Sequence, residues 1–216
     1  MASFSFITII IIAANVIITY KGLGDLNFFD RYKFHIGSIK GGDKFRMFSS
    51  GFLHVNTLHL FFNMFTLYFF APVVIAYLGD FRFIIIYIVS LILGSLLSYY
   101  FHKDEYNYTA VGASGAITGV LYSAILLRPD MSLYFFLIPI PIPAYVFGIG
   151  YLLYSIYGIK KSIGNIGHDA HFGGAVGGYV ATLLMFPILL QTNLLMVLLL
   201  ALPIGILFFM HKTGKL

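Results

Sequence analysis

Ser114 and His171 are the two residues of this chain whose side chains suit acyl-transfer chemistry. A serine hydroxyl is a weak nucleophile until a neighbouring base removes its proton, and histidine is the side chain that most often takes it. Gly112 and Gly115 flank Ser114 closely, and glycine permits a tight turn and a close backbone approach. We predict that Ser114 is a nucleophile and His171 its general base. The alternatives are close helix packing through the small residues and a polar anchor at a membrane interface.

A third polar group lies earlier in the chain, at His54, His59 and Asn63. His59 and Asn63 are four residues apart, so they share one face of a helix. An amide N–H beside an imidazole can stabilise the negative charge that develops on a carbonyl oxygen. We therefore predict that His59 and Asn63 are oxyanion donors and that His54 supports them. A structural hydrogen-bonding role is the alternative for each.

The same histidines raise the question of a metal. A catalytic zinc site needs three protein ligands and commonly a carboxylate base. The H-E-x-x-H arrangement is absent, and Asp169, next to His168, is the only carboxylate near these histidines in the sequence. We expect no metal and no cofactor. The alternative for Asp169 is a third member of a Ser-His-Asp triad.

The composition places this chemistry in a membrane. The 216 residues are 60% hydrophobic and 10% charged, with a mean hydropathy of +0.93, which excludes an ordinary water-soluble globule. The 13 Lys and Arg are scattered over the connections between the apolar stretches, so anionic lipid headgroups are expected as their partners and nucleic acid is not. With no cysteine, disulfides and thiolate chemistry are excluded.

Hydropathy predicts an all-α polytopic fold built on six spans. Leu194–Met210 is predicted as a seventh span; because Pro203 lies within it, an interfacial helix is the alternative. Residues 1–216 are expected to form a single domain, with a core at 1–190 and the extra span and tail at 191–216. Without a basic n-region or an A-x-A-like site, the first apolar stretch is expected to be retained. The six spans are Phe4–Tyr20, Phe52–Leu78, Phe81–Phe101, Ala113–Leu127, Pro143–Tyr157 and Ala170 to about Leu190.

The connections between these spans differ in length. Residues 21–50 form a long loop that carries six of the 13 Lys and Arg, whereas Gly79-Asp80 leaves room only for a tight turn. Prolines at every second residue from Pro139 to Pro143 predict an extended segment at the membrane interface, because proline inside a helix removes a backbone hydrogen bond.

The span count predicts which residues meet. In a bundle with short loops, even-numbered spans all begin on the same side of the membrane. His54, His59 and Asn63 lie at the start of the second span, Ser114 opens the fourth and His171 opens the sixth, so all are expected near one face. Gly174 and Gly178 share a helix face with His171, and such small residues let another helix come close.

The combined pattern resembles the signature of the rhomboid intramembrane proteases over about residues 1–190. The matching motifs are His54-x-x-x-x-His59-x-x-x-Asn63, Gly112-x-Ser114-Gly115 and Ala170-His171-x-x-Gly174. The resemblance implies a rhomboid-like six-helix bundle, with one extra C-terminal helix in some members. It also implies a Ser-His dyad without an acid, in which His171 takes the Ser114 proton and returns it to the leaving amine. His59, Asn63 and the Ser114 backbone N–H would form the oxyanion hole, with His54 in support.

Two positions depart from the family pattern. Phe45-Arg46 stands where many members have Trp-Arg, and Thr118 stands where many have an aromatic residue that stacks on the histidine. The family places its first loop and active site outside the cytoplasm, although the basic residues of this loop run against the positive-inside expectation. We follow the family orientation and expect a multi-pass protein of a bacterial plasma membrane.

The function that the resemblance implies is an intramembrane serine endopeptidase that cleaves single-span transmembrane proteins. One alternative is a catalytically silent protein that binds membrane clients without cutting them. Another is a small proton-relaying transporter, which we disfavour because the sequence has neither paired acidic residues in mid-span nor repeated halves.

Overall fold

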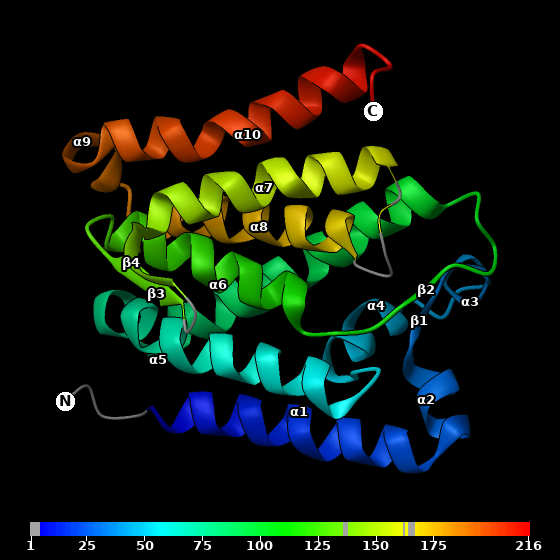
Figure 1. Ribbon diagram of the computed structural model, residues 1–216. Coiled ribbons are helices and arrows are strands. Elements are labelled where there is room, and N and C mark those ends of the chain that lie inside the picture. The colour runs from blue at the N-terminus through cyan, green and yellow to red at the C-terminus, as the bar shows by residue number, and fades with distance from the viewer. Residues whose placement is uncertain (1–4, 136–137, 162, 164–166) are drawn as a thin grey trace.

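Long helices lying side by side form the body of the protein (Figure 1). The computed structural model describes residues 5–135, 138–161, 163 and 167–216, with the backbone alone at 134–135 and 138–139. The predicted all-α polytopic fold is confirmed in this part of the chain. The long helices are α1 (Phe6–Gly24), α5 (Thr57–His102), α6 (Ser114–Leu127), α7 (Ala144–Lys161), α8 (His168–Met185) and α10 (Leu194–Lys212).

Shorter elements fill the connections. The long first loop is structured by α2 (Leu26–Tyr32), β1 (Phe34–His35), α3 (Ile36–Lys40), α4 (Arg46–Ser49) and the 3-10 turn η1 (Ser50–Phe52). β1 pairs antiparallel with β2 (Thr109–Ala110), with Phe34 opposite Ala110. The loop is therefore tied to the segment that leads into α6.

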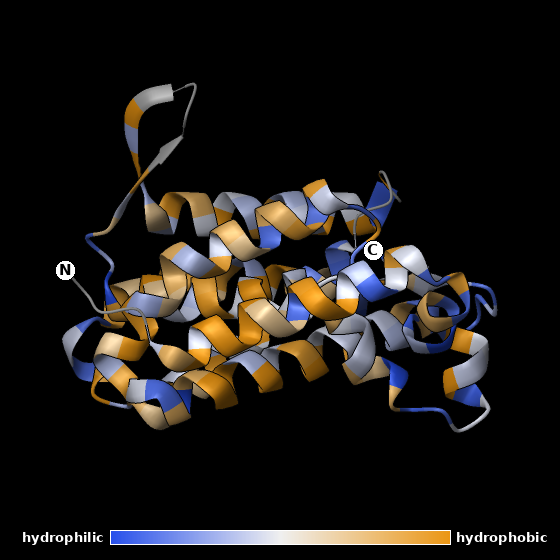
Figure 2. Ribbon diagram, turned by 90° about the horizontal axis from the view of Figure 1, so that it is seen from below, coloured by the Kyte–Doolittle hydropathy of each residue, from blue (hydrophilic) through white to orange (hydrophobic). Residues whose placement is uncertain are grey.

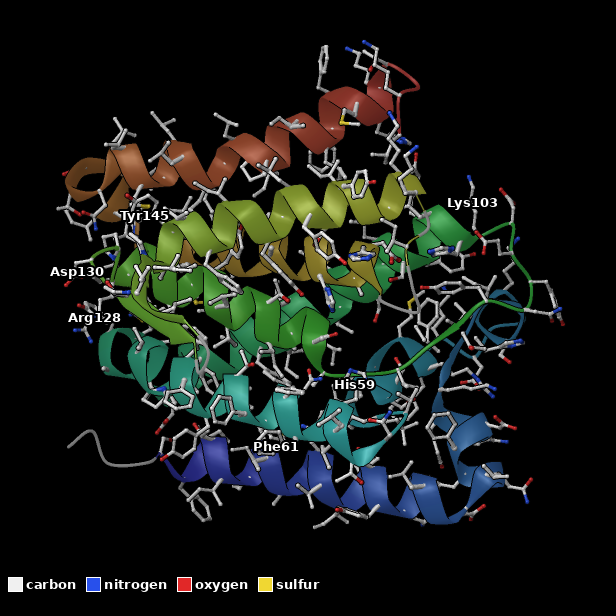
Figure 3. The ribbon with its side chains drawn as sticks, in the orientation of Figure 1. His59, Phe61, Lys103, Arg128, Asp130 and Tyr145 are labelled. Carbon is white, nitrogen blue, oxygen red and sulfur yellow. The ribbon has the colours of Figure 1, made fainter. Side chains whose placement is uncertain are left out.

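Helix α5 contains the third predicted span and the second from Thr57 onward. The predicted start of the second span at Phe52 is wrong, because Asn56 caps the helix and His54 lies in the segment before it. The two helical runs meet at Gly79, whose φ of 78° and ψ of 168° are not helical. Glycine adopts a positive φ at little cost, so the predicted tight turn falls at the residue that can make it. Figure 3 shows His59 and Lys103, near the two ends of α5, toward one end of the bundle, with Arg128, Asp130 and Tyr145 at the other.

Length and apolar composition suit α1, α5 and α10 to crossing a membrane, and α6 is a shorter apolar helix. In Figure 2 hydrophobic residues prevail along the helices and hydrophilic ones gather near the ends of the bundle. Pro203 lies inside α10 without ending it. Near its end, the His211 Nε2 lies 2.8 Å from the Tyr100 hydroxyl of α5. α10 thus runs the length of the bundle, which favours a seventh span over an interfacial helix.

The sixth span is shorter than predicted, because α8 ends at Met185 and Pro187 follows. The short helix α9 (Leu189–Thr192) comes after it. The proline-rich stretch is extended as predicted, since β4 (Ile138–Pro143) pairs with β3 (Ser132–Phe135) in a hairpin that stands away from the bundle in Figure 2. Phe4 and residues 136–137 lie outside the described residues.

Glycines bring α8 onto α5 and α6. A Cβ atom added to Gly174 would overlap the backbone of Gly115, and one added to Gly178 would overlap the backbone of Gly119. On the opposite side, a Cβ on Gly173 would lie 2.5 Å from the Leu93 carbonyl oxygen. Without side chains at these positions, the helix backbones can touch, as small residues allow in membrane bundles.

Candidate active site

Ser114 is the first residue of α6. The preceding Ala113 is the N-cap and makes no side-chain capping bond, and the first N–H groups of a helix have no partner within the helix itself. Gly112 has a φ of +135°, and its N–H donates to the Ser50 carbonyl at 3.0 Å. A Cβ at Gly112 would lie 2.8 Å from the Cε1 atom of His59. Both the backbone conformation and the close imidazole therefore require glycine here.

His171 lies in the first turn of α8, where its N–H donates to the Gly167 carbonyl at 3.0 Å. Its Nε2 atom is 2.7 Å from the Ser114 Oγ atom. The side chain is buried, with 7% of its surface exposed. The predicted hydrogen-bond reach between these residues of α6 and α8 is therefore observed. A neutral imidazole at this distance can accept the serine proton.

The other ring nitrogen of His171 faces α7. Its Nδ1 atom lies 2.8 Å from the Tyr151 hydroxyl, and the two ring centroids are 5.6 Å apart. Sequence reasoning did not single out Tyr151, which is one of 16 tyrosines and stands in no local motif. Asp169 turns elsewhere, with its Oδ2 atom 3.6 Å from His102 Nε2 on α5. The Nδ1 position of a Ser-His-Asp triad is thus held by Tyr151, and the alternative role for Asp169 is wrong in this geometry.

His54 lies behind the loop that carries Gly112. Its Nε2 atom accepts the Ala113 N–H at 3.4 Å, and its Nδ1 atom is 2.8 Å from the Thr19 hydroxyl of α1. The ring is fully buried and lies edge-on to His59 at 4.9 Å between centroids. His54 therefore links α1 to the backbone just before Ser114.

His59 and Asn63 differ in their access to the site. His59 lines the cavity in front of Ser114, and its backbone N–H is capped by the Asn56 side chain at 2.8 Å. Asn63 is buried but is not among the lining residues, and its amide donates to the His59 carbonyl at 2.9 Å. Because that bond uses one amide N–H, the group retains a second donor.

A cavity of about 700 Å³ lies in front of the two helix starts. Its walls combine the structured first loop, the second half of α5, the segment at 109–112 and the starts of α6 and α8. Polar groups and apolar side chains share these walls, as is typical of sites that bind a ligand. No cluster of three potential metal ligands occurs among the described residues. The predicted site residues that line the cavity are His59, Gly112, Ser114, Gly115 and His171.

A family model described as the Rhomboid domain matches residues 41–188. The chain belongs to the rhomboid family. Because the match begins in the first loop and ends beyond α8, the rhomboid region includes Ser114, His171, His54 and His59. Together with the apolar helices, this membership makes the chain an integral membrane protein.

Several named rhomboid proteins are similar to this chain. RHOMBOID-like protein 12, mitochondrial, of Arabidopsis thaliana is 26% identical over 190 residues, which are 80% of this chain and 56% of that protein. Rhomboid protein 1, mitochondrial, of Saccharomyces cerevisiae is 31% identical over 62% of this chain and 40% of its own length. Rhomboid protease GluP of Bacillus subtilis is 33% identical over 66% of this chain and 26% of its own length. The chain therefore spans only part of each of these relatives.

Proposed function

We propose that this rhomboid protein is an intramembrane serine endopeptidase that hydrolyses peptide bonds in or near transmembrane helices. The observation that carries the proposal is the 2.7 Å distance between His171 Nε2 and Ser114 Oγ at the edge of a cavity. A nucleophile within hydrogen-bond reach of a base is the arrangement that activates serine. A relative named as a rhomboid protease adds support.

The chemistry follows from these contacts. Ser114 Oγ attacks the scissile carbonyl carbon while His171 Nε2 takes the hydroxyl proton, which forms a tetrahedral intermediate with a negatively charged oxygen. His171 then returns the proton to the leaving amine, and an acyl group stays on Ser114. A water molecule then attacks the acyl carbon while His171 takes one of its protons. The bond between that carbon and Ser114 Oγ breaks, His171 returns the proton to Oγ, and the carboxylic acid product leaves.

Donors around Ser114 are suited to the oxyanion. The Ser114 backbone N–H lies at the N-terminus of α6, where the helix dipole favours negative charge. His59 lines the same cavity, close to Gly112. Asn63, one helical turn further, retains a second amide N–H beside the bond that it donates to the His59 carbonyl. Preorganised donors of this kind supply about 3 kcal/mol each in acyl transfer.

We propose single-span membrane proteins as substrates. The peptide must be extended to present a carbonyl to Ser114, so a transmembrane substrate has to unwind locally near the end of its helix. Membrane lipids are the other expected partners, and a bacterial plasma membrane is the proposed location. If the wild-type protein binds such substrates without cutting them, the alternative function, a catalytically silent client-binding protein, is supported instead.

The test uses the purified protein in detergent with a single-span substrate. We expect cleavage near one end of the substrate helix, and a fall of more than about a thousandfold in Ser114→Ala and in His171→Ala. Ser123→Ala is the matched control, because Ser123 lies further along α6 and bonds Thr182 on α8 instead of the cavity. Thermal unfolding should show that each variant still folds. Undiminished cleavage by Ser114→Ala would refute the mechanism.

A further inference from the structure

Tyr151 stands where a serine hydrolase with a full triad has its acid. Its hydroxyl is 2.8 Å from His171 Nδ1, on the far side of the ring from Ser114. We propose that Tyr151 is a positioning residue that fixes the tautomer and orientation of His171, an inference that rests on the proposed peptidase function. At the position where many family members carry an aromatic residue, this chain has Thr118.

The tautomer follows from hydrogen-bond roles. For Nε2 to accept the Ser114 proton, the neutral imidazole must carry its hydrogen on Nδ1. The Nδ1–H group then donates to the Tyr151 oxygen. When Nε2 becomes protonated, Nδ1–H still donates to the same oxygen, so the ring keeps its place throughout the cycle. Only the serine proton moves, from Ser114 Oγ to His171 Nε2.

The Thr118 hydroxyl of α6 is engaged elsewhere, because it donates to the Ser114 carbonyl at 2.7 Å. The hydroxyls of Tyr151 and Ser114 are the groups that hydrogen-bond the two nitrogens of the His171 ring. Both hydroxyls are neutral, which avoids a buried carboxylate beside the imidazole within the membrane.

Packing of α7 against α6 holds Tyr151 in place. One turn earlier, the Gly148 carbonyl accepts the buried Tyr122 hydroxyl of α6 at 2.6 Å. A Cβ on Gly148 would lie 2.8 Å from the Ile125 Cδ1 atom, so glycine lets the two helices come together. The dyad therefore depends on three helices, with α6 supplying Ser114, α8 supplying His171 and α7 supplying the group that orients it.

The main test is Tyr151→Phe, which keeps the ring and removes the hydroxyl. We expect kcat to fall about tenfold, as for the loss of one hydrogen bond that matters at the transition state, while KM changes less than about twofold. Tyr157→Phe is the matched control, because Tyr157 is on the same helix and exposed; its kcat should equal that of the wild type. An unchanged kcat in Tyr151→Phe would overturn the proposal.

Nitrogen NMR of histidine-labelled protein supplies a readout that a purely structural role would not change. The His171 signals, assigned by their loss in His171→Ala, should report the Nδ1–H tautomer in the resting wild type and a mixture in Tyr151→Phe. An Nε2–H tautomer in the wild type, or a tautomer unaffected by the substitution, would overturn the proposal even if kcat falls.

The two levels of inference fail in different ways. If the wild type does not cleave any single-span substrate, the peptidase function fails, while the NMR signals still report whether Tyr151 sets the tautomer. If the wild type cleaves, Ser114→Ala does not, and Tyr151→Phe matches the wild type, only the role of Tyr151 fails.

Discussion

Gly174 is the position where one methyl group should separate the helices that carry Ser114 and His171. A Cβ atom added there would overlap the Gly115 carbonyl oxygen and lie 2.6 Å from its carbon and 3.0 Å from its Cα atom. These are backbone atoms of α6, so no side chain can rotate away. Ordinary carbon contacts require about 3.5 Å or more, so α8 has to move away from α6 by roughly 1 Å.

The size of the effect follows from that displacement. Gly174 is three residues after His171 on the same helix, so a shift of α8 moves the imidazole away from Ser114. A misplacement of about 1 Å in a catalytic group costs about a hundredfold in rate. Overpacking a close helix contact costs about 1–3 kcal/mol of folding free energy. We therefore expect Gly174→Ala to fold with a lower midpoint of thermal unfolding and to lose about a hundredfold in kcat.

The assay compares Gly174→Ala with Gly150→Ala. Gly150 is also inside a long helix, but a Cβ there would have no neighbour within 4 Å, so its substitution should leave activity intact and stabilise α7 slightly. Initial rates of substrate cleavage, rates of Ser114 labelling by a fluorophosphonate and unfolding midpoints are measured for each. Gly174→Ala with the rate and the midpoint of the wild type would show that the glycine contact does not set the dyad distance.

Two further results are expected. Gly112→Ala should lower kcat about tenfold or more and destabilise the fold by about 1–2 kcal/mol, because alanine tolerates the φ of +135° poorly and its Cβ would meet His59; full activity would contradict this. Because the chain has no cysteine, single cysteines at Lys44, Lys215 and Asp130 can be labelled with an impermeant maleimide in sealed vesicles. The maleimide should label Lys44→Cys and Lys215→Cys from one side of the membrane and Asp130→Cys from the other. Labelling of Lys215→Cys from the same side as Asp130→Cys would exclude a seventh span.

The site depends on contacts between residues far apart in the sequence, and the sequence predicted part of them. Span count alone placed Ser114, His171 and His59 on one face, because each begins a helix that starts on the same side. The small residues at Gly174 and Gly178 indicated which face of the sixth span would lie against another helix. The turn at Gly79 was likewise readable, since few other residues can reverse the chain so sharply between two apolar stretches.

The sequence did not predict which residues of the neighbouring helices these residues contact. Nothing in the sequence distinguishes Tyr151 from the other tyrosines of α7, or directs Asp169 toward His102 instead of His171. The position of Asn63 behind His59, off the cavity wall, was also missed, because four-residue spacing predicts a shared face but not how far that face turns toward the cavity.

The physical reason is that sequence patterns describe local properties, whereas contacts between helices depend on how the helices pack. Hydropathy and glycine content are local properties of the chain, so the sequence by itself determined the membrane helices, their order and the end of the bundle at which each polar residue lies. Rotation and tilt of each helix are set by packing against its neighbours. Only the tertiary structure therefore decided that His171 reaches Ser114 with one nitrogen and Tyr151 with the other.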